Sequence, residues 1–547
     1  SNTFLASFQF DDYTHILGNE GIRNIGNLKS LWNYWPTRFI TFFSFAVNYY
    51  FNQFNVFGYH LINLIIHLSS SLLAWWFISL TFSTPAMKNI KLSLSSKQIA
   101  FFGALIFLSH PIQTEAVTYI YQRSTSLAAF FYLLSISLYV KSRLLQLLDN
   151  RPFGWKILYL WSWIFAVSGI FTKETTITLP LMLILYEYFF LRTQGRIKWM
   201  NIVPFLFLMP VIPLILFFKK QPNSSDIEQL VRYPVTAGQY LLIQIRVIVT
   251  YIRLLFVPFN QNLDYNYPLT RTPVELAALI SFLILSIILA VAIWLFRRHR
   301  IFSFAIFWFF LTLLIESSII PLGDVIFEHR LYLPMIGYSF LIASGLFYMF
   351  HGKKNKVAVI ILSLLIIFYS TLTYRRNKIW ENELTLWSDV MKKSPGKARP
   401  CNYLCSAYID IGNNEEAVKW CRKAIQIDPF FPRVYYNLGN AYINMGKNEE
   451  AMQAYRKEIQ NNPNFLEACN NLAAMYTAVG KIDEALVLWN RIVQLNPDFV
   501  TAHFNLSQFY FGQGRYDLAV KHCNEVTRRG YKVDPKFLKL LEPHQNK

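Results

Sequence analysis

The chain has 547 residues, of which 54% are hydrophobic and only 15% are charged. Soluble globular proteins carry about 25% charged residues, so this composition excludes a purely soluble protein. The aromatic share of 17% excludes intrinsic disorder. The formal net charge of +20 comes from short basic runs between long apolar segments, which indicates a multi-pass membrane protein beside anionic lipid rather than a nucleic-acid-binding protein.

Apolar segments that could cross a bilayer as helices fill the first two thirds of the chain. We place them at 56–82, 98–110, 125–140, 156–172, 175–191, 199–218, 273–296, 301–320, 331–350 and 356–373. A further segment, 239–257, carries Arg246 and Arg253 seven residues apart on one helical face. We therefore expect this segment to lie flat in the membrane interface.

The positions of the Lys- and Arg-rich loops distinguish an interfacial 239–257 segment from one that crosses the membrane. If 239–257 does not cross, the Lys and Arg residues of 88–97, 141–156, 192–198, 297–300 and 353–356 all fall on one side, which is the cytoplasm by the positive-inside rule. Residues 1–55, 110–124, 172–174, 219–272 and 321–330 then lie outside, with everything after about 374. Because no signal peptide begins at Ser1, we expect one transmembrane helix upstream of the given sequence.

The last third is soluble in character and repeats every 34 residues. Glycine recurs at Gly412, Gly446, Gly480 and Gly514, and tyrosine, alanine and proline positions follow the same step. This is the helix–turn–helix pattern of tetratricopeptide (TPR) repeats. We predict an all-α protein: a multi-pass membrane domain over 1–378, then a TPR superhelix over 379–547. The latter comprises a half-repeat at 379–397 and repeats at 398–431, 432–465, 466–499 and 500–533.

All five cysteines lie in this part of the chain, at Cys401, Cys405, Cys421, Cys469 and Cys523. None has a metal-ligand spacing beside histidine. We therefore expect buried apolar thiols in helices rather than a zinc site.

Polar residues gather in the loops that this topology places outside. They are Asp11, Asp12 and His15; His110, Glu115 and Arg123; Lys173 and Glu174; and Glu328, His329, Arg330 and Tyr332. Taken singly, each group also fits a helix cap, an interfacial anchor or an ion pair. Their occurrence on one membrane face favours a site for a phosphate-bearing lipid donor, because cations hold a phosphate leaving group and a carboxylate takes a proton from a hydroxyl.

The order of these motifs resembles GT-C glycosyltransferases of the protein O-mannosyltransferase class. Most closely it resembles the transmembrane-and-TPR O-mannosyltransferases (the TMTC family), with this chain as a prokaryotic relative. The motifs are Phe10-Asp11-Asp12 with Asn19, His110-Pro111 through Val117 with Arg123, Lys173-Glu174, Arg253 through Pro258 to Asp264-Tyr265, Glu328 through Pro334, and the TPR tail. The second loop departs from the animal enzymes, with Tyr121-Gln122-Arg123-Ser124 in place of Gly-Arg-Ala-Asp, which leaves the sugar and the acceptor open.

The resemblance implies an inverting transferase that uses a polyprenyl-phosphate sugar and needs no cofactor or divalent metal. Asp11 or Asp12 would be the general base, the sequence leaving open which, with Glu115 as a third catalytic candidate. The donor phosphate would be held by Arg123, Lys173, His329 and Arg330. The remaining cleft residues would be His15, His110, Glu174, Asp264, Glu328 and Tyr332.

We expect the TPR groove to bind an acceptor protein or peptide through Asn437, Asn471 and Asn505, which are 34 residues apart on the first helix of each repeat. The leading hypothesis is transfer of a mannose-like sugar to a hydroxyl, Ser or Thr of an exported protein, on the periplasmic face of a bacterial inner membrane. The competing hypothesis is a membrane-anchored TPR scaffold for envelope or polysaccharide assembly. A transporter is less favoured, because no ionisable pair is evident in the middle of the membrane.

Overall fold

The computed structural model describes residues 2–88, 90–148, 154–192, 197–218, 235–268, 272, 275–318, 320–529 and 531–544. Over these residues the chain is helical and contains no strand, which confirms the predicted all-α class. The chain divides into two compact units, Ser1–Lys393 and Ser394–Lys547. Arg151 and Arg196, counted among the basic connections, lie outside the described residues.

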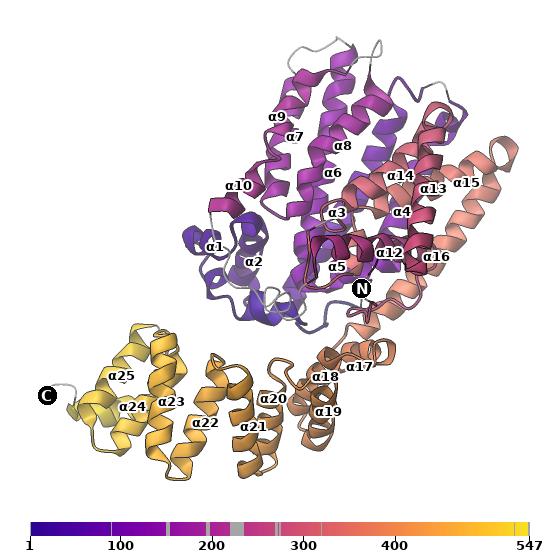
Figure 1. The fold of residues 1–547 in the computed structure, drawn as a ribbon. Coiled ribbons are helices and arrows are strands. Elements are labelled where there is room, and N and C mark those ends of the chain that lie inside the picture. Colours follow the sequence, from indigo (N-terminus) through magenta and orange to yellow (C-terminus); the bar gives the residue numbers. More distant parts are fainter. Residues whose placement is uncertain are drawn as a thin grey trace. The chain divides into compact units, whose positions relative to one another are not determined.

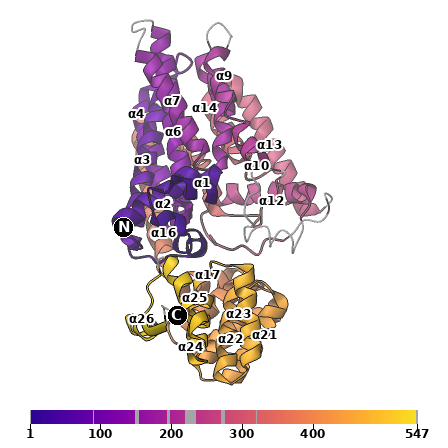
Figure 2. The ribbon, with the colours of Figure 1, turned by 90° about the vertical axis from the view of Figure 1, so that its left-hand side faces the viewer.

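The first unit is a bundle of apolar helices (Figures 1 and 2). Its longer helices are α2 (Phe39–Asn52), α3 (Val56–Phe82), α4 (Ser96–Ser109), α6 (Arg123–Leu148), α7 (Gly154–Ile170), α12 (Ala237–Phe256), α13 (Leu276–Arg298), α14 (Arg300–Leu313), α15 (Met335–Met349), α16 (Asn355–Ile379) and α17 (Glu383–Lys393). The shorter ones are α1 (Leu28–Tyr34), α5 (Thr114–Thr118), α8 (Leu179–Tyr186), α9 (Val203–Leu206) and α10 (Val211–Phe218).

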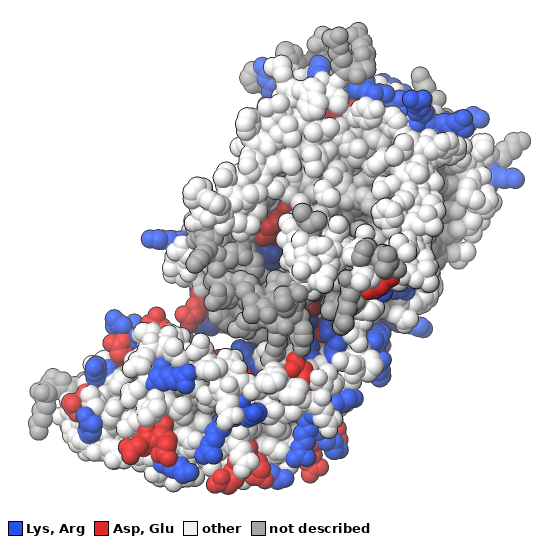
Figure 3. Space-filling model, viewed as in Figure 1, with Lys and Arg blue, Asp and Glu red and all other residues white. Residues whose placement is uncertain are grey.

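Seven helical stretches among the described residues are long and apolar enough to cross a membrane. They are Val56–Phe82, Lys91–Ser109, Ile120–Leu147, Glu174–Leu191, Ala237–Phe256, Leu276–Arg298 and Asn355–Ile379. Helices such as α13 and α16 expose large apolar side chains, including Phe282, Ile293 and Leu364, which suits contact with lipid rather than water. On the face that Figure 3 shows, the first unit carries few charged side chains, and Lys and Arg gather at one of its ends.

Helix α12 is long enough to cross a membrane, yet three of its side chains donate to one segment, the connection between α14 and α15. Tyr240, Gln244 and Tyr251 donate to the backbone carbonyls of Glu316, Val325 and Phe327, all between α14 and α15. Since these three side chains share one helix face along most of α12, the helix runs beside that connection instead of away from it. Figure 1 shows α12 lying across the bundle helices. The interfacial placement thus stays a prediction, now with geometric support.

At the basic end of the bundle the structure contains an ion pair that sequence analysis missed. Arg143 of α6 binds Glu187, and both side chains are fully buried. Tyr139 donates to the same carboxylate at 2.9 Å. Because an unpaired charge could not be buried there, this cluster ties α6 to the segment after α8.

Helix α17 belongs to the first unit although it lies in the segment that we assigned to a TPR half-repeat. Its Asp389 accepts from Arg376 of α16 at 2.9 Å, and its Trp387 packs edge-on against Phe10 at 5.9 Å. These contacts hold α17 against the first loop of the chain.

The second unit consists of helix pairs with 34-residue spacing: α18 (Ala398–Asp410) and α19 (Asn414–Ile427), α20 (Val434–Asn444) and α21 (Asn448–Asn461), α22 (Leu466–Ala478) and α23 (Ile482–Leu495), α24 (Val500–Gly512) and α25 (Tyr516–Arg528), then α26 (Pro535–Leu541). The recurring glycines stand at the turn inside each pair, with φ between 71° and 79°. Only glycine adopts this left-handed conformation without strain, which explains the period.

Two of the five cysteines contradict the expectation of free thiols, because Cys405 and Cys421 form a disulfide between α18 and α19. Cys401, Cys469 and Cys523 are free and buried, as expected. The TPR repeat explains why these two cysteines pair. One period later the same positions are Gly439 and Tyr455, and a Cβ added at Gly439 would lie 2.6 Å from the Tyr455 ring. The two positions face each other directly, so a cysteine pair there forms a bond.

Arg298, at the end of α13, tests the topology. Replacing Arg298→Cys should give a thiol that a membrane-impermeant maleimide labels only after the membrane is permeabilised, because the interfacial placement of α12 puts this end in the cytoplasm. Glu381→Cys, at an exposed position after α16, is the matched control and should be labelled from outside. Labelling of Arg298→Cys in intact cells would show that α12 crosses the membrane.

Candidate active site

The two adjacent aspartates have different surroundings. The Asp12 carboxylate is fully buried and accepts the backbone N–H of Gln9 at 2.9 Å and of Tyr121 at 2.8 Å. Burial raises the pKa of Asp12 well above its ordinary value, and the two backbone N–H groups offset only part of this. Asp12 therefore pins the first loop to the second.

Asp11 is partly exposed. Its backbone N–H donates to the Tyr119 hydroxyl at 2.9 Å, and its carboxylate lies near three phenols, those of Tyr34, Tyr119 and Tyr121. Burial and then the charge of Asp11 raise the pKa of Tyr34 to about 12. Phe10, just before it, has a φ of 48°, a left-handed conformation that costs energy for an aromatic residue. Of the two candidates that the sequence left open, the geometry favours Asp11 as the base.

His15 completes the aromatic surroundings of Asp11. Its Nδ1 is 2.9 Å from the Tyr34 hydroxyl, and its ring stacks on Tyr121 at 4.6 Å between centroids. Burial, and then the charge of Arg38, lower the pKa of His15 to about 4. The ring is therefore neutral at pH 7, and its Nδ1 shares one hydrogen bond with the phenol.

Two acid–base pairs lie next to this aromatic group. Arg38 binds Glu174 at 3.3 Å and donates to the Tyr121 hydroxyl at 2.9 Å. Lys173 binds Glu316 at 2.7 Å and donates to the Thr125 hydroxyl at 2.9 Å. Sequence analysis found Lys173 and Glu174 but missed Arg38 and Glu316, because each stands alone in an apolar stretch.

His329 and Glu115 form a buried pair. His329 Nδ1 is 2.6 Å from one Glu115 oxygen, and the other oxygen accepts the backbone N–H of Glu328 at 3.0 Å. Burial raises the pKa of Glu115, and the neighbouring charge of Glu328 raises it further. Because Nδ1 is held by Glu115, the opposite nitrogen of the ring is the one that can meet a ligand.

Burial, and then three cations, lower the pKa of His329 well below its ordinary value; the cations are Lys173, Arg330 and Arg38. The four side chains are therefore electrostatic neighbours. Arg330 is held by the carbonyls of Val325 at 3.0 Å and Asp324 at 2.7 Å. The cluster of three cations, Arg38, Lys173 and Arg330, around the neutral His329 ring, hereafter the cation cluster, is chemically suited to an anion.

Glu328 is the centre of a second buried network. One oxygen accepts the Asn262 backbone N–H and the Tyr265 hydroxyl, both at 2.6 Å, and the other accepts the Gln261 amide at 2.9 Å. Asp264 lies in the same loop, where the Asn262 amide donates to its carbonyl at 3.1 Å. This loop after α12 thus reaches the predicted site.

Three predicted site residues have structural partners instead. Arg123, expected at the donor phosphate, donates to the amide oxygens of Asn63 and Asn48 at 2.6 and 2.7 Å and to backbone carbonyls. His110 bonds the Leu255 carbonyl at 3.0 Å. Tyr332 bonds His67 at 2.9 Å inside the bundle. Each satisfies a buried group and holds helices together, which favours a supporting role.

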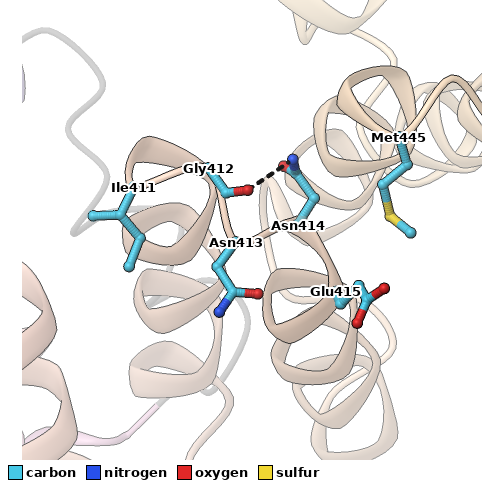
Figure 4. Close-up of a pocket in the computed structure, with 6 residues that line it drawn as sticks. All are labelled: Ile411, Gly412, Asn413, Asn414, Glu415 and Met445. Carbon is cyan, nitrogen blue, oxygen red and sulfur yellow. Dashed lines mark hydrogen bonds between the residues drawn. The ribbon is translucent and has the colours of Figure 1, made fainter.

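No group of three or more His, Cys, Asp or Glu side chains within the described ranges is arranged to hold a metal ion. In the second unit, a shallow hollow of about 610 Å³ is lined by Ile411, Gly412, Asn413, Asn414, Glu415 and Met445 (Figure 4). Figure 4 shows the Asn414 amide turned onto the Gly412 carbonyl. The hollow follows the first TPR turn and has no cationic lining, so it does not suit a phosphate.

The C-terminal third matches TPR family models: a TPR repeat over 406–446 and tetratricopeptide repeats over 432–465 and 471–531. The chain contains TPR repeats, as the 34-residue period predicted. Among solved structures, it is similar to the crystal structure of MamA, with 24% identity over 27% of this chain and 86% of that chain at a TM-score of 0.25, and to that of YrrB, with 20% identity over 26% and 74% at 0.24.

The similarity to curated proteins covers more of the chain than the TPR unit and so reaches into the membrane unit. The human protein O-mannosyl-transferase TMTC3 is 25% identical over 485 residues, covering 80% of this chain and 51% of that protein. The protein O-mannosyl-transferase F38B6.6 of Caenorhabditis elegans is 26% identical over 448 residues, covering 78% and 60%. The chain thus spans about half the length of these relatives. The resemblance to transmembrane-and-TPR O-mannosyl-transferases is confirmed, while the prokaryotic origin stays a prediction.

Asp11 and Asp12 should contribute differently to the free energy of unfolding. Asp12→Asn replaces an oxygen that accepts a backbone N–H with an amide that cannot, so the free energy of unfolding should fall by about 1–3 kcal/mol. Asp11→Asn should lower it less, by about 1 kcal/mol at most, because the partly exposed Asp11 side chain loses only the charge that strengthens its contact with the Tyr119 hydroxyl. Thermal unfolding of the purified chain in detergent measures both. Equal destabilisation by the two variants would contradict the assignment of Asp12 as the structural carboxylate.

Proposed function

We propose that the protein is a membrane glycosyltransferase that moves a mannose-like sugar from a polyprenyl-phosphate donor to a hydroxyl, Ser or Thr of an exported protein. One observation carries the proposal: the partly exposed Asp11 carboxylate is an electrostatic neighbour of Tyr121, whose hydroxyl accepts from Arg38 of the cation cluster. A base and an anion-binding group thus occur together beside the helix ends. The similarity to protein O-mannosyl-transferases supports the same activity.

The chemistry is a single displacement with inversion. Asp11 takes the proton of the acceptor hydroxyl as its oxygen attacks the anomeric carbon of the sugar. The bond from that carbon to the phosphate oxygen breaks, and the electron pair leaves with the polyprenyl phosphate. Lys173 and Arg330 stabilise the charge that develops on the leaving phosphate. The scheme needs no metal ion, and that expectation stays a prediction.

Neutral His329 suits the same phosphate. Burial raises the pKa of Glu115, and a protonated Glu115 donates to Nδ1 of the neutral ring. The distal nitrogen then carries the ring hydrogen and donates it to a phosphate oxygen without adding a full charge. Glu115 is fully engaged by His329 and the Glu328 N–H. This favours Glu115 as an orienting carboxylate rather than a second base.

The competing scaffold function accounts for the TPR unit but not for the membrane unit. The membrane unit buries Glu115, Glu328, His329 and Arg330 together, and clusters of buried ionisable groups occur more often at functional sites than elsewhere. The observation favours the transferase.

The TPR unit is proposed to bind the acceptor. The amide nitrogens of Asn437 and Asn505 donate to Asn402 and Asn470 of the preceding repeat, at 3.0 and 2.8 Å, and that of Asn471 donates to the Tyr455 hydroxyl at 3.3 Å. Their nitrogens are thus turned inward. This leaves the oxygens as a row of acceptors 34 residues apart, which suits the backbone N–H groups of an extended peptide.

The disulfide between Cys405 and Cys421 supports an external location for the TPR unit. Disulfides form and persist in the periplasm and outside the cell, whereas the cytosol keeps thiols reduced. The basic runs independently favour a cytoplasmic position for the opposite loops. We therefore propose that the candidate active site and the repeats face the periplasm or exterior.

Asp11→Asn tests the catalytic role. It should lower the turnover of polyprenyl-phosphate mannose about 100- to 10,000-fold, because an amide cannot accept the hydroxyl proton, while binding of the donor stays unchanged. Transfer to a Ser/Thr-rich peptide and donor binding are measured with purified protein. Glu20→Gln, which changes an exposed acid of the same loop, should retain full turnover. Activity retained by Asp11→Asn would remove Asp11 from the mechanism.

The asparagine row is tested by the triple change Asn437→Ala, Asn471→Ala and Asn505→Ala. Acceptor KM should rise about tenfold or more, since each lost hydrogen bond contributes about 0.5–1.5 kcal/mol, while donor hydrolysis stays unchanged. Asn402→Ala with Asn470→Ala removes two of the same contacts between repeats but keeps the proposed acceptor oxygens, and it should retain peptide affinity. If both sets weaken binding equally, the row acts only through repeat packing.

A further inference from the structure

The loop after α12 has no regular secondary structure between Val257 and Tyr265, so side-chain contacts must hold it in place. Three of its groups converge on the Glu328 carboxylate: the Asn262 N–H, the Tyr265 hydroxyl and the Gln261 amide. The same amide donates to the Pro111 carbonyl at 3.1 Å. The buried Glu328 carboxylate therefore keeps these three hydrogen bonds only while the loop stays in this position.

Lys393 holds the loop from the other side. Its ammonium donates to the Gln261 carbonyl at 2.7 Å and to the Asp389 carboxylate at 2.6 Å. Asp389 is also bound by Arg376 of α16. Asp389 thus fixes the Lys393 ammonium on α17, and the same ammonium donates a second hydrogen bond to the loop.

From Gln261 the hydrogen bonds continue to the candidate active site. The Gln261 amide meets Glu328, the Glu328 N–H donates to Glu115, and Glu115 holds His329 Nδ1. Gln261, Glu328, Glu115 and His329 are each at least nine-tenths buried, whereas Lys393 is partly exposed. A shift of the Gln261 backbone would leave buried acceptors unpaired at each step, which is unfavourable because they have no water to replace the lost donor.

We propose that Lys393 is a positioning residue for His329: by holding the Gln261 carbonyl it fixes Glu328 and, through Glu328, the Glu115–His329 pair. Lys393 touches no reacting atom. Its effect on turnover rests on the proposed transferase function, whereas its effect on the loop does not. It is the last residue of the first unit, and the chain continues directly into the TPR repeats.

Lys393→Met tests the proposal, because methionine keeps the apolar stem but cannot donate. The control is Lys392→Met, the adjacent exposed lysine. Hydrogen exchange of the full chain, read at the amides of Asn262 and Glu328, should be about tenfold faster in Lys393→Met and unchanged in Lys392→Met. Both amides donate directly to carboxylates of the chain. Lys393→Arg, which can still donate to both partners, should restore protection.

The second measurement is transfer from polyprenyl-phosphate mannose. We expect kcat/KM for the donor to fall about tenfold in Lys393→Met, with acceptor KM unchanged, and to recover in Lys393→Arg. Unchanged protection at Asn262 and Glu328 in Lys393→Met would overturn the proposal. Faster exchange with wild-type kcat/KM would also overturn it, because the loop would then move without consequence for His329. If the unaltered protein transfers no sugar, the transferase function fails, and the exchange result alone decides the role of Lys393 in holding the loop.

Discussion

The arrangement of the candidate site depends on one buried carboxylate, that of Asp12. It accepts one backbone N–H from its own loop and one from Tyr121, so it joins two loops that are more than 100 residues apart. Tyr121 in turn stacks on His15 and accepts from Arg38. This anchor fixes the backbone next to Asp11 and the Tyr121 ring that accepts from Arg38, two contacts that offset the desolvation cost of the buried carboxylate.

The same principle recurs at Glu115, Glu328 and Glu187. Each is a buried acid whose oxygens are occupied by donors from segments distant in sequence. In an apolar bundle the packing of Leu, Ile and Phe is tolerant of small shifts, whereas hydrogen-bonded charges are not. The buried acids thus give the membrane unit defined loop positions, and the apolar side chains give it its general shape.

Much of this could be predicted from the sequence where a pattern is periodic or clustered. Apolar runs predicted the membrane helices, and Gly412 with its three equivalents predicted the TPR turns because only glycine suits their φ. The pairs Asp11-Asp12, Lys173-Glu174 and His329-Arg330 predicted the candidate site, and the structure places each of them in the buried polar networks described above. The sequence could not show which residues that lie far apart along the chain bind each other in the fold. Arg38 and Glu316 are isolated in apolar segments, the roles of Asp11 and Asp12 differ only by burial, and Arg123 is occupied by Asn48 and Asn63 from other helices. The Cys405–Cys421 bond likewise depends on two helices being antiparallel neighbours.

The central claim is that the cation cluster holds a lipid phosphate, and an experimental structure with a bound polyprenyl phosphate tests it most directly. The account predicts the phosphate within hydrogen-bonding distance of His329, Lys173 and Arg330, with the anomeric position of a sugar donor on the side of Asp11. A phosphate bound instead at Arg246 or Arg253 on α12, or beside the basic run of 297–300, would contradict it.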